Sequence, residues 1–223
     1  MRIDYPVSLV EWVLGLFFPG RCLLCGQVVP IGRLFCEECV DELPEEPLCR
    51  EITLAGNRSL GVCSALPYTG GFRETLHGFK FQGQQALARP IAWLMAEAAG
   101  DIASFDGVAY APMYGADRQK RGYDQSRLLA KYLAKALGLP LTDALEKARR
   151  TQAQHGLGRA ARLENPRNAY QARFALTGRR LLLVDDIVTT GSTLRECAQT
   201  LYLAGAREVR CVCAADTPPG DLP

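Results

Sequence analysis

Residues 181–194 read LLLVDDIVTTGSTL: an apolar run, two adjacent aspartates, and then a loop rich in hydroxyl groups. The apolar run has the length and composition of a buried strand, and residues 192–205 have helical spacing. In an open parallel sheet, ligands bind beyond the carboxyl ends of the strands, where a loop enters the next helix. Residues 185–193 occupy such a position, so the stretch predicts a ligand site.

The remainder of the body favours an α/β fold, because predicted strands alternate with predicted helices. Residues 114–125 are expected to form a polar loop, and residues 149–171 a long lid or linker. The alternation predicts a doubly wound parallel sheet flanked by helices. Strands are expected at 60–70, 105–113, 179–186 and 208–216, and helices at 71–83, 86–100, from Asp124 or Ser126 to Gly138, and 192–205.

The hydroxyl-rich loop suits a phosphate group, because its consecutive N–H groups precede the positive end of a helix. The two aspartates would repel a phosphate, but carboxylates accept hydrogen bonds from the hydroxyls of a sugar, with magnesium nearby. The alternative is a strand that ends in helix-capping aspartates, yet one such residue is enough for a cap. The pattern therefore predicts a ribose 5-phosphate site. Its expected residues are Asp185 and Asp186 for the sugar, and Thr189, Thr190, Gly191, Ser192 and Thr193 for the phosphate.

Charge is distributed unevenly along the chain of 223 residues, although its formal net charge is only +2. Residues 115–180 contain 15 Lys and Arg against 5 Asp and Glu. A basic segment in a nearly neutral chain indicates a phosphate-bearing ligand. Ordinary solvated helix faces account for part of this excess. The length allows one α/β domain with a small appendage.

Two C-x-x-C pairs near the N-terminus, separated by ten residues, predict a zinc site. Disulfides and a redox pair are the competing readings. Disulfides are rare in the cytoplasm, and a thioredoxin-like motif has a single pair after a strand. Four thiolates leave no open coordination position, so the expected role is structural. The ligands are Cys22, Cys25, Cys36 and Cys39.

The other five cysteines are assigned no chemistry from the sequence. Cys49 and Cys63 lack C-x-x-C partners. Cys197, Cys211 and Cys213 lie in a predicted helix and strand, where cysteine usually behaves as a small buried hydrophobe.

Residues 7–18 have an apolar helical face formed by Val10, Val13, Leu14, Phe17 and Phe18. The segment is too short to span a bilayer, and it lacks the features of a signal peptide. It is expected to pack on the body of the protein or on a partner. A cytoplasmic location is the default expectation.

The stretch VDDIVTTGST resembles the phosphoribosyl pyrophosphate (PRPP) signature of type I phosphoribosyltransferases. The resemblance implies that the two aspartates hold the ribose hydroxyls and that residues 189–193 hold the 5-phosphate. It further implies a hood over the site and a pyrophosphate loop that acts with Mg²⁺. That loop is expected to contain Arg118, Lys120, Arg121 and Gly122.

The order of motifs from Pro19 to about Ala215 resembles the ComF family of competence proteins: a four-cysteine ribbon, LHGFKFQG, DRQKRGYDQS and RTQAQHGLGRAARLEN. The family's basic loop has one more residue before the second basic position, and its hood pattern is contracted here. The chain lacks further cysteine pairs, so no second metal is expected. The hood residues are Arg150, Thr151, Gln154 and Leu157, followed by Arg162 and Asn165.

The resemblance implies a zinc-binding unit at 1–48 and a phosphoribosyltransferase-like domain at 60–220. It also implies a role in natural transformation, in which the protein handles incoming single-stranded DNA with a helicase-like ATPase and other competence proteins. Single-strand binders pair basic grooves with aromatic platforms. The basic segment offers few aromatic side chains, so the sequence evidence for direct DNA binding is weak.

The alternative function is an active phosphoribosyltransferase that transfers phosphoribose from PRPP to an unknown acceptor. Some nucleobase transferases carry an acid in the loop, but this chain has Ile187, Val188 and Thr189 there. No general acid or base, and hence no catalytic residue, is named from the sequence. A zinc-stabilised scaffold with a vestigial pocket is a third reading. The preferred prediction is a PRPP-binding, ComF-like protein of DNA uptake.

Overall fold

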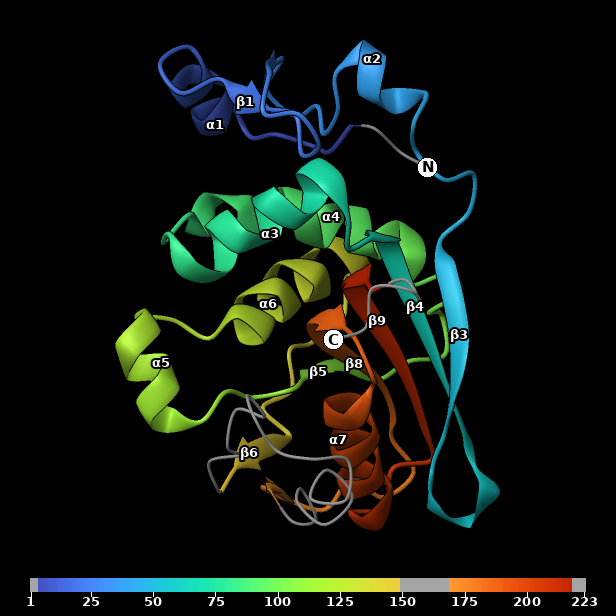
Figure 1. Ribbon diagram of the computed structural model, residues 1–223. Helices are drawn as coiled ribbons and strands as arrows, with labels where there is room; N and C mark the ends of the chain where they lie inside the picture. Colours follow the sequence, from blue (N-terminus) through green and yellow to red (C-terminus); the bar gives the residue numbers. More distant parts are fainter. Residues whose placement is uncertain (1–3, 149–168, 218–223) are drawn as a thin grey trace, which may run out of the picture.

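The computed structural model describes residues 4–148 and 169–217, which form a central sheet with helices on both faces and a small ribbon on top (Figure 1). The sheet has five strands in the order β3-β4-β9-β8-β5. Strands β4, β9, β8 and β5 are parallel, and β3 pairs with β4 in the antiparallel direction. The strands are β3 (Leu48–Thr53), β4 (Ser59–Pro67), β9 (Glu208–Asp216), β8 (Arg180–Val188) and β5 (Gly107–Tyr110).

The expected parallel sheet is therefore present, with one antiparallel strand added at its edge. Apart from Leu48, that strand, β3, lies between the predicted ranges 1–48 and 60–220. It is followed by a short 3-10 turn, Ala55–Asn57. The helices of the body are α3 (Gly70–Phe81), α4 (Ala88–Ala98), α5 (Gly115–Arg121), α6 (Gln125–Leu137) and α7 (Ser192–Leu203), and a 3-10 turn (Gln85–Leu87) precedes α4.

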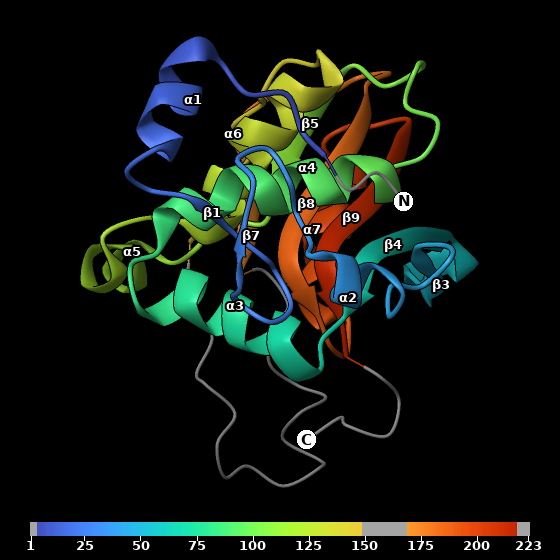
Figure 2. The same cartoon turned by 90° about the horizontal axis from the view of Figure 1, so that it is seen from above.

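Strand β8 is buried on both faces, which explains its unbroken apolar sequence. Leu182 and Val184 belong to the core beneath α4 and α6, whereas Leu181 and Leu183 belong to the core beneath α7. Seen from above, α4 crosses over β8 and β9 (Figure 2). Burial on both sides holds the end of β8, and hence the two aspartates, in a rigid frame.

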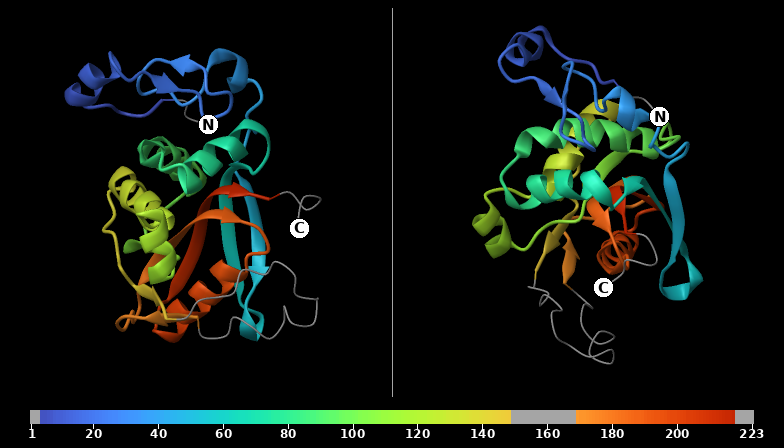
Figure 3. Two further views of the ribbon diagram at one scale, coloured as in Figure 1. Left: turned by 60° about the vertical axis from the view of Figure 1, so that its left-hand side comes forward. Right: turned by 45° about the horizontal axis from the view of Figure 1, so that its top comes forward.

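The cysteine ribbon lies on the outer side of the α3–α4 layer, away from the sheet (Figure 3). The hydroxyl of Thr75 on α3 donates a hydrogen bond to the carbonyl of Leu23 at 2.8 Å. A Cβ added at Gly71 would overlap the carbonyl of Leu24, so the two backbones approach as closely as they can. The ribbon contains β1 (Gly20–Arg21), β2 (Val28–Val29) and α2 (Glu37–Val40).

The N-terminal helix α1 (Leu9–Gly15) begins with a capping box in which Ser8 and Glu11 each bond the other's backbone. It is shorter than the predicted 7–18 segment and contains no buried residue. Phe17 and Phe18 are about three-quarters exposed. Of the two expectations, packing of this apolar face on the body is therefore not observed. Among the described residues, no helix is long and apolar enough to cross a membrane.

The expected loop at 114–125 is wrong, because residues Gly115–Arg121 form helix α5. Asp117 lies in its first turn, and Gly122 ends it in the left-handed conformation with φ of 83°. Asp124, and not Ser126, caps α6, since its side chain accepts a hydrogen bond from the backbone N–H of Arg127 at 3.0 Å.

A small two-stranded sheet, β6 (Leu145–Lys147) and β7 (Tyr170–Ala172), flanks the chain segment that carries the predicted hood. The hood residues themselves, from Arg150 to Asn165, lie outside the described residues. Nothing in the described part of the chain therefore tests the hood pattern.

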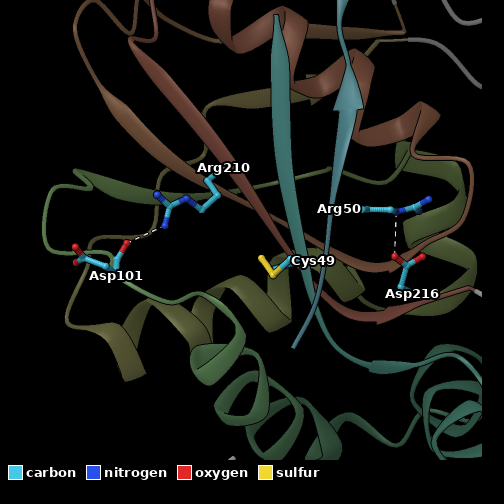
Figure 4. Close-up of a disulfide and its surroundings, with 6 residues drawn as sticks. Cys49, Arg50, Asp101, Arg210 and Asp216 are labelled. Carbon is cyan, nitrogen blue, oxygen red and sulfur yellow. Dashed lines mark hydrogen bonds and ion pairs between the residues drawn. A yellow bond between two sulfur atoms is a disulfide. The ribbon is translucent and has the colours of Figure 1, made fainter. Parts of the chain in front are cut away.

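Cys49 and Cys63 form a disulfide, which corrects the expectation that they have no chemistry (Figure 4). The register of β3 and β4 places them directly opposite each other. The register of the antiparallel β3–β4 hairpin decides this proximity, and no C-x-x-C spacing indicates it. The other expectation is confirmed, because Cys197, Cys211 and Cys213 are fully buried in the core. Burial raises the pKa of all three thiols.

Candidate functional site

The two aspartates lie at the carboxyl end of β8 and have different partners. Asp185 Oδ1 accepts a hydrogen bond from the Ser126 hydroxyl at 2.8 Å. Asp186 Oδ2 is 2.9 Å from the ammonium of Lys80. Each carboxylate is further held by a backbone N–H, that of Asp186 at 3.0 Å and that of Ile187 at 2.7 Å respectively. The pair is thus preorganised by groups from α3, α6 and its own strand.

Burial shapes the charges of this pair. Desolvation, with the neighbouring Asp186, raises the pKa of Asp185 to about 7, although Ser126 and Lys80 oppose the increase. Desolvation is the largest single influence on Lys80 and would lower its pKa, but the charge and hydrogen bond of Asp186, together with the charge of Asp185, raise the pKa of Lys80 overall. One ammonium therefore lies beside two carboxyl groups, and a ligand cation or hydroxyl donors would favour the ionised form of Asp185.

The loop after β8 turns sharply at Gly191, which is the N-cap of α7 and has φ of 71°. A glycine cap provides no side-chain acceptor of its own, although the N–H of Ser192, the first residue of α7, donates to the Thr190 hydroxyl at 3.4 Å. Thr189, Thr190 and Ser192 are exposed there, and the Thr190 hydroxyl donates to the Ser192 hydroxyl at 3.2 Å. This is the geometry of an anion site at a helix N-terminus.

Residues 118–121 of the predicted pyrophosphate loop lie in helix α5, and the side chain of Arg121 reaches the region of Lys80. The Arg121 guanidinium lies 4.8 Å from the centre of the Phe81 ring and donates to Gln125 at 3.3 Å. A cavity of about 350 Å³ is lined by Lys80, Phe81, Gly83, Asp117 and Arg121. Arg121 and the lysine that pairs with Asp186 thus share one cavity.

The other residues predicted for the pyrophosphate loop are less closely connected to the aspartates. Burial raises the pKa of Asp124, and the charge of Arg118 opposes this only after the backbone N–H groups of Arg127 and Met113. Lys120 lies on α5, and its side chain is outside the described residues. Gly122 ends the helix.

Lys80 and Ser126 belong to this constellation but are absent from the residues predicted for the site. Lys80 lies within the LHGFKFQG motif, and the lysine between two phenylalanines at the end of a helix was the available signal. From the sequence, Ser126 is only a possible helix cap. Both residues are more than 55 positions from the aspartates in sequence, so only folding reveals their proximity.

The donor set at the aspartates fits magnesium, because two carboxylates and a hydroxyl are hard oxygen ligands. An additional cation beside Asp185 would stabilise its ionised form and so lower its raised pKa. Asp185 and Asp186 are the residues that would hold Mg²⁺ together with a ligand's hydroxyls. The ion would supply charge neutralisation for a pyrophosphate group.

The four cysteines of the ribbon converge as predicted. One Sγ atom from each of Cys22, Cys25, Cys36 and Cys39 lies within 4.8 Å of the others, and the sulfurs of Cys25 and Cys36 are 3.6 Å apart. A tetrahedron of zinc–sulfur bonds of about 2.3 Å requires separations of this size. Burial tends to raise the pKa of Cys22, but backbone N–H groups of neighbouring residues lower it to about 7. The cluster therefore fits a structural zinc site.

Comparison with known proteins agrees with both parts of the molecule. The phosphoribosyl transferase domain family matches residues 124–223, and the double zinc ribbon domain family matches residues 13–66. The fold and its site thus define a phosphoribosyltransferase-like domain with an N-terminal zinc ribbon.

The relatives narrow this class. DNA utilization protein YhgH of Salmonella typhi is 30% identical over 91% of this chain and 99% of that protein. Competence protein F of Haemophilus influenzae is 28% identical over 83% of this chain and 81% of that protein. Competence protein ComFC of Streptococcus pneumoniae is 24% identical over 85% of this chain and 97% of that protein. The chain belongs to this family of competence and DNA utilization proteins, as the sequence motifs predicted.

Proposed function

We propose that this protein binds PRPP with Mg²⁺ at Asp185, Asp186 and residues 189–193, and acts in the uptake and handling of DNA. The observation that carries the proposal is the preorganised carboxylate pair next to a glycine-capped helix N-terminus. Carboxylates suit the ribose diol, and the helix start suits its phosphate. Lys80 and Arg121, which line one cavity near the pair, suit the pyrophosphate.

The names of the relatives, which refer to DNA utilization and competence, support the second half of the proposal. The ribbon and the basic segment are the candidate surfaces for single-stranded DNA or for protein partners. DNA binding through phosphate contacts weakens steeply as salt is added. A salt titration with a fluorescent oligonucleotide therefore separates direct DNA binding from a purely protein-mediated role.

The decisive experiment is calorimetric titration with PRPP, with and without Mg²⁺. Wild type should bind only weakly without the ion, and the Asp185→Asn, Asp186→Asn double variant should lose binding in both conditions. Glu46→Gln, an exposed acid between the ribbon and the sheet, is the matched control and should bind like wild type. Absence of Mg²⁺-dependent binding to wild type would contradict the proposal.

Turnover is a separate question, and the site geometry assigns no proton-transfer residue to it. Holding a diol, a phosphate and a departing pyrophosphate in place is by itself a source of rate acceleration. Pyrophosphate release from bound PRPP, measured with candidate nitrogen and oxygen acceptors, tests the transferase alternative. Binding without release in every case would favour a ligand-sensing or structural use of PRPP.

A further inference from the structure

Strand β3 packs against the loop that follows β8, although more than 130 residues separate them in sequence. The guanidinium of Arg50 donates a hydrogen bond to the Thr189 carbonyl at 2.6 Å. The same side chain forms an ion pair with Asp216 at the end of β9, with Nε and Oδ2 2.9 Å apart (Figure 4). Arg50 therefore connects the edge strand β3, the end of β9 two positions away in the sheet, and the loop.

The bond to the Thr189 carbonyl orients the next N–H group. A peptide bond is planar and trans, so its N–H points opposite to its C=O. With the carbonyl of Thr189 held toward β3, the N–H of Thr190 must point away from β3. This peptide opens the predicted phosphate loop, whose function requires its N–H groups to converge on one anion.

Two further contacts join β3 to the same loop. Ile52 packs directly against Gly191, where any added Cβ would overlap its side chain. The carbonyl of Thr53 accepts a hydrogen bond from Arg195 in the first turn of α7 at 3.1 Å. Three residues of β3 thus contact the loop along its length: Arg50 at Thr189, Ile52 at Gly191, and Thr53 at Arg195 in α7.

We infer that Arg50 is a positioning residue for the phosphate loop, and that β3 is part of the ligand site. This inference rests on the proposed binding of ribose 5-phosphate by residues 189–193. It assigns a role to a strand that lies outside the predicted phosphoribosyltransferase-like range. Arg50 acts through the Thr189–Thr190 peptide, and its own contact with a ligand is not required.

The test compares Arg50→Met with a closely matched control, Arg210→Met. The two arginines are similarly exposed, at 36% and 35% of the side chain. Each also forms an ion pair and donates to a backbone carbonyl, which for Arg210 is that of Asp101 at 2.9 Å. Arg210 is on the same sheet but has no contact with the loop among the described interactions (Figure 4).

Calorimetry with two separate fragments of PRPP gives the first readout. Arg50→Met should bind ribose 5-phosphate about tenfold more weakly than wild type, since one charge-assisted hydrogen bond that orders the loop is lost. Magnesium pyrophosphate, which does not use residues 189–193, should bind with unchanged affinity. Arg50→Lys can keep only one of the two contacts and should give an intermediate affinity, while Arg210→Met should bind both fragments like wild type.

Hydrogen exchange in the ligand-free protein gives the second readout, which is independent of the proposed function. Amides of residues 190–193 should exchange faster in Arg50→Met than in wild type or Arg210→Met. Unchanged exchange together with wild-type affinity for ribose 5-phosphate would overturn the inference. An equal loss of affinity for ribose 5-phosphate and for magnesium pyrophosphate would also overturn the inference, because it would indicate general unfolding. If wild type binds neither fragment while exchange responds as expected, the proposed function fails and the positioning role remains.

Discussion

Replacing Lys80 by methionine should destabilise the protein by about 3 kcal/mol at pH 8. The Lys80 ammonium and an Asp186 oxygen are 2.9 Å apart, and their side chains are only 19% and 11% exposed. With an effective dielectric constant of about 20, two unit charges at this distance attract by about 6 kcal/mol before the cost of desolvation. Breaking a buried pair by removing one partner typically costs 3–5 kcal/mol.

Proton uptake limits this loss. The stranded pair of carboxylates can bind a proton, and raising the pKa of a carboxyl by one unit corresponds to about 1.4 kcal/mol. The charge of Lys80 lowers the pKa of Asp185, so its removal raises that pKa and the folded variant holds more protons than the folded wild type. The free energy of unfolding of the Lys80→Met variant then increases, relative to that of wild type, as the pH falls. The destabilisation should therefore be smaller at pH 5 than at pH 8.

Urea denaturation followed by circular dichroism at both pH values measures this difference. Arg173→Met is the control, since it removes an ion pair with Glu146 whose two side chains are half exposed and 3.7 Å apart. That change should cost less than about 1 kcal/mol. Combining Lys80→Met with Asp186→Asn should restore much of the lost stability. A loss below about 0.5 kcal/mol at pH 8, or one that grows as the pH falls, would refute the reasoning.

Three other substitutions have expected outcomes. Gly191→Ala should cost at least about 2 kcal/mol in a denaturation curve, because φ is 71° and the new Cβ overlaps Ile52. The same change made in an Ile52→Ala background should cost less, by the part due to overlap, and an equal cost in both backgrounds would contradict the overlap. Replacing Cys49 and Cys63 by serine should lower the free energy of unfolding by about 2 kcal/mol. Dithiothreitol should destabilise wild type but not this variant. Equal sensitivity of both proteins to the reductant would exclude the disulfide as the cause of the stability difference. Gly71→Ala should displace the ribbon from α3, because the new Cβ would overlap the Leu24 carbonyl. Proteolysis in residues 41–47 should then accelerate while the zinc content is retained. Unchanged cleavage would contradict the close backbone approach.

Local patterns were sufficient to predict the main elements and the candidate ligand residues. The LLLV run, the aspartate pair and the TTGST loop follow each other directly, so strand, carboxylates and helix start are specified within 14 residues. The observed strand continues two residues further, to Val188. The C-x-x-C pairs likewise determine their own clustering, because each pair closes a short turn.

The error at α5 has a local cause. Its sequence, GADRQKR, is polar and lacks an apolar stripe, so hydrophobic periodicity provides no signal for a helix. The residues nevertheless have good intrinsic helix propensity, apart from glycine and aspartate at the start, and Gly122 supplies the stop. Propensity and capping were therefore the better indicators there.

The sequence by itself determined an α/β domain with a four-cysteine ribbon and an acidic–hydroxyl loop, because these features depend on neighbouring residues. Only the tertiary structure decided which distant groups complete the site. Lys80 reaches Asp186 from α3, and Arg50 reaches Thr189 from an edge strand. Strand register likewise joined Cys49 to Cys63. Such contacts depend on packing and register, which a single sequence does not encode locally.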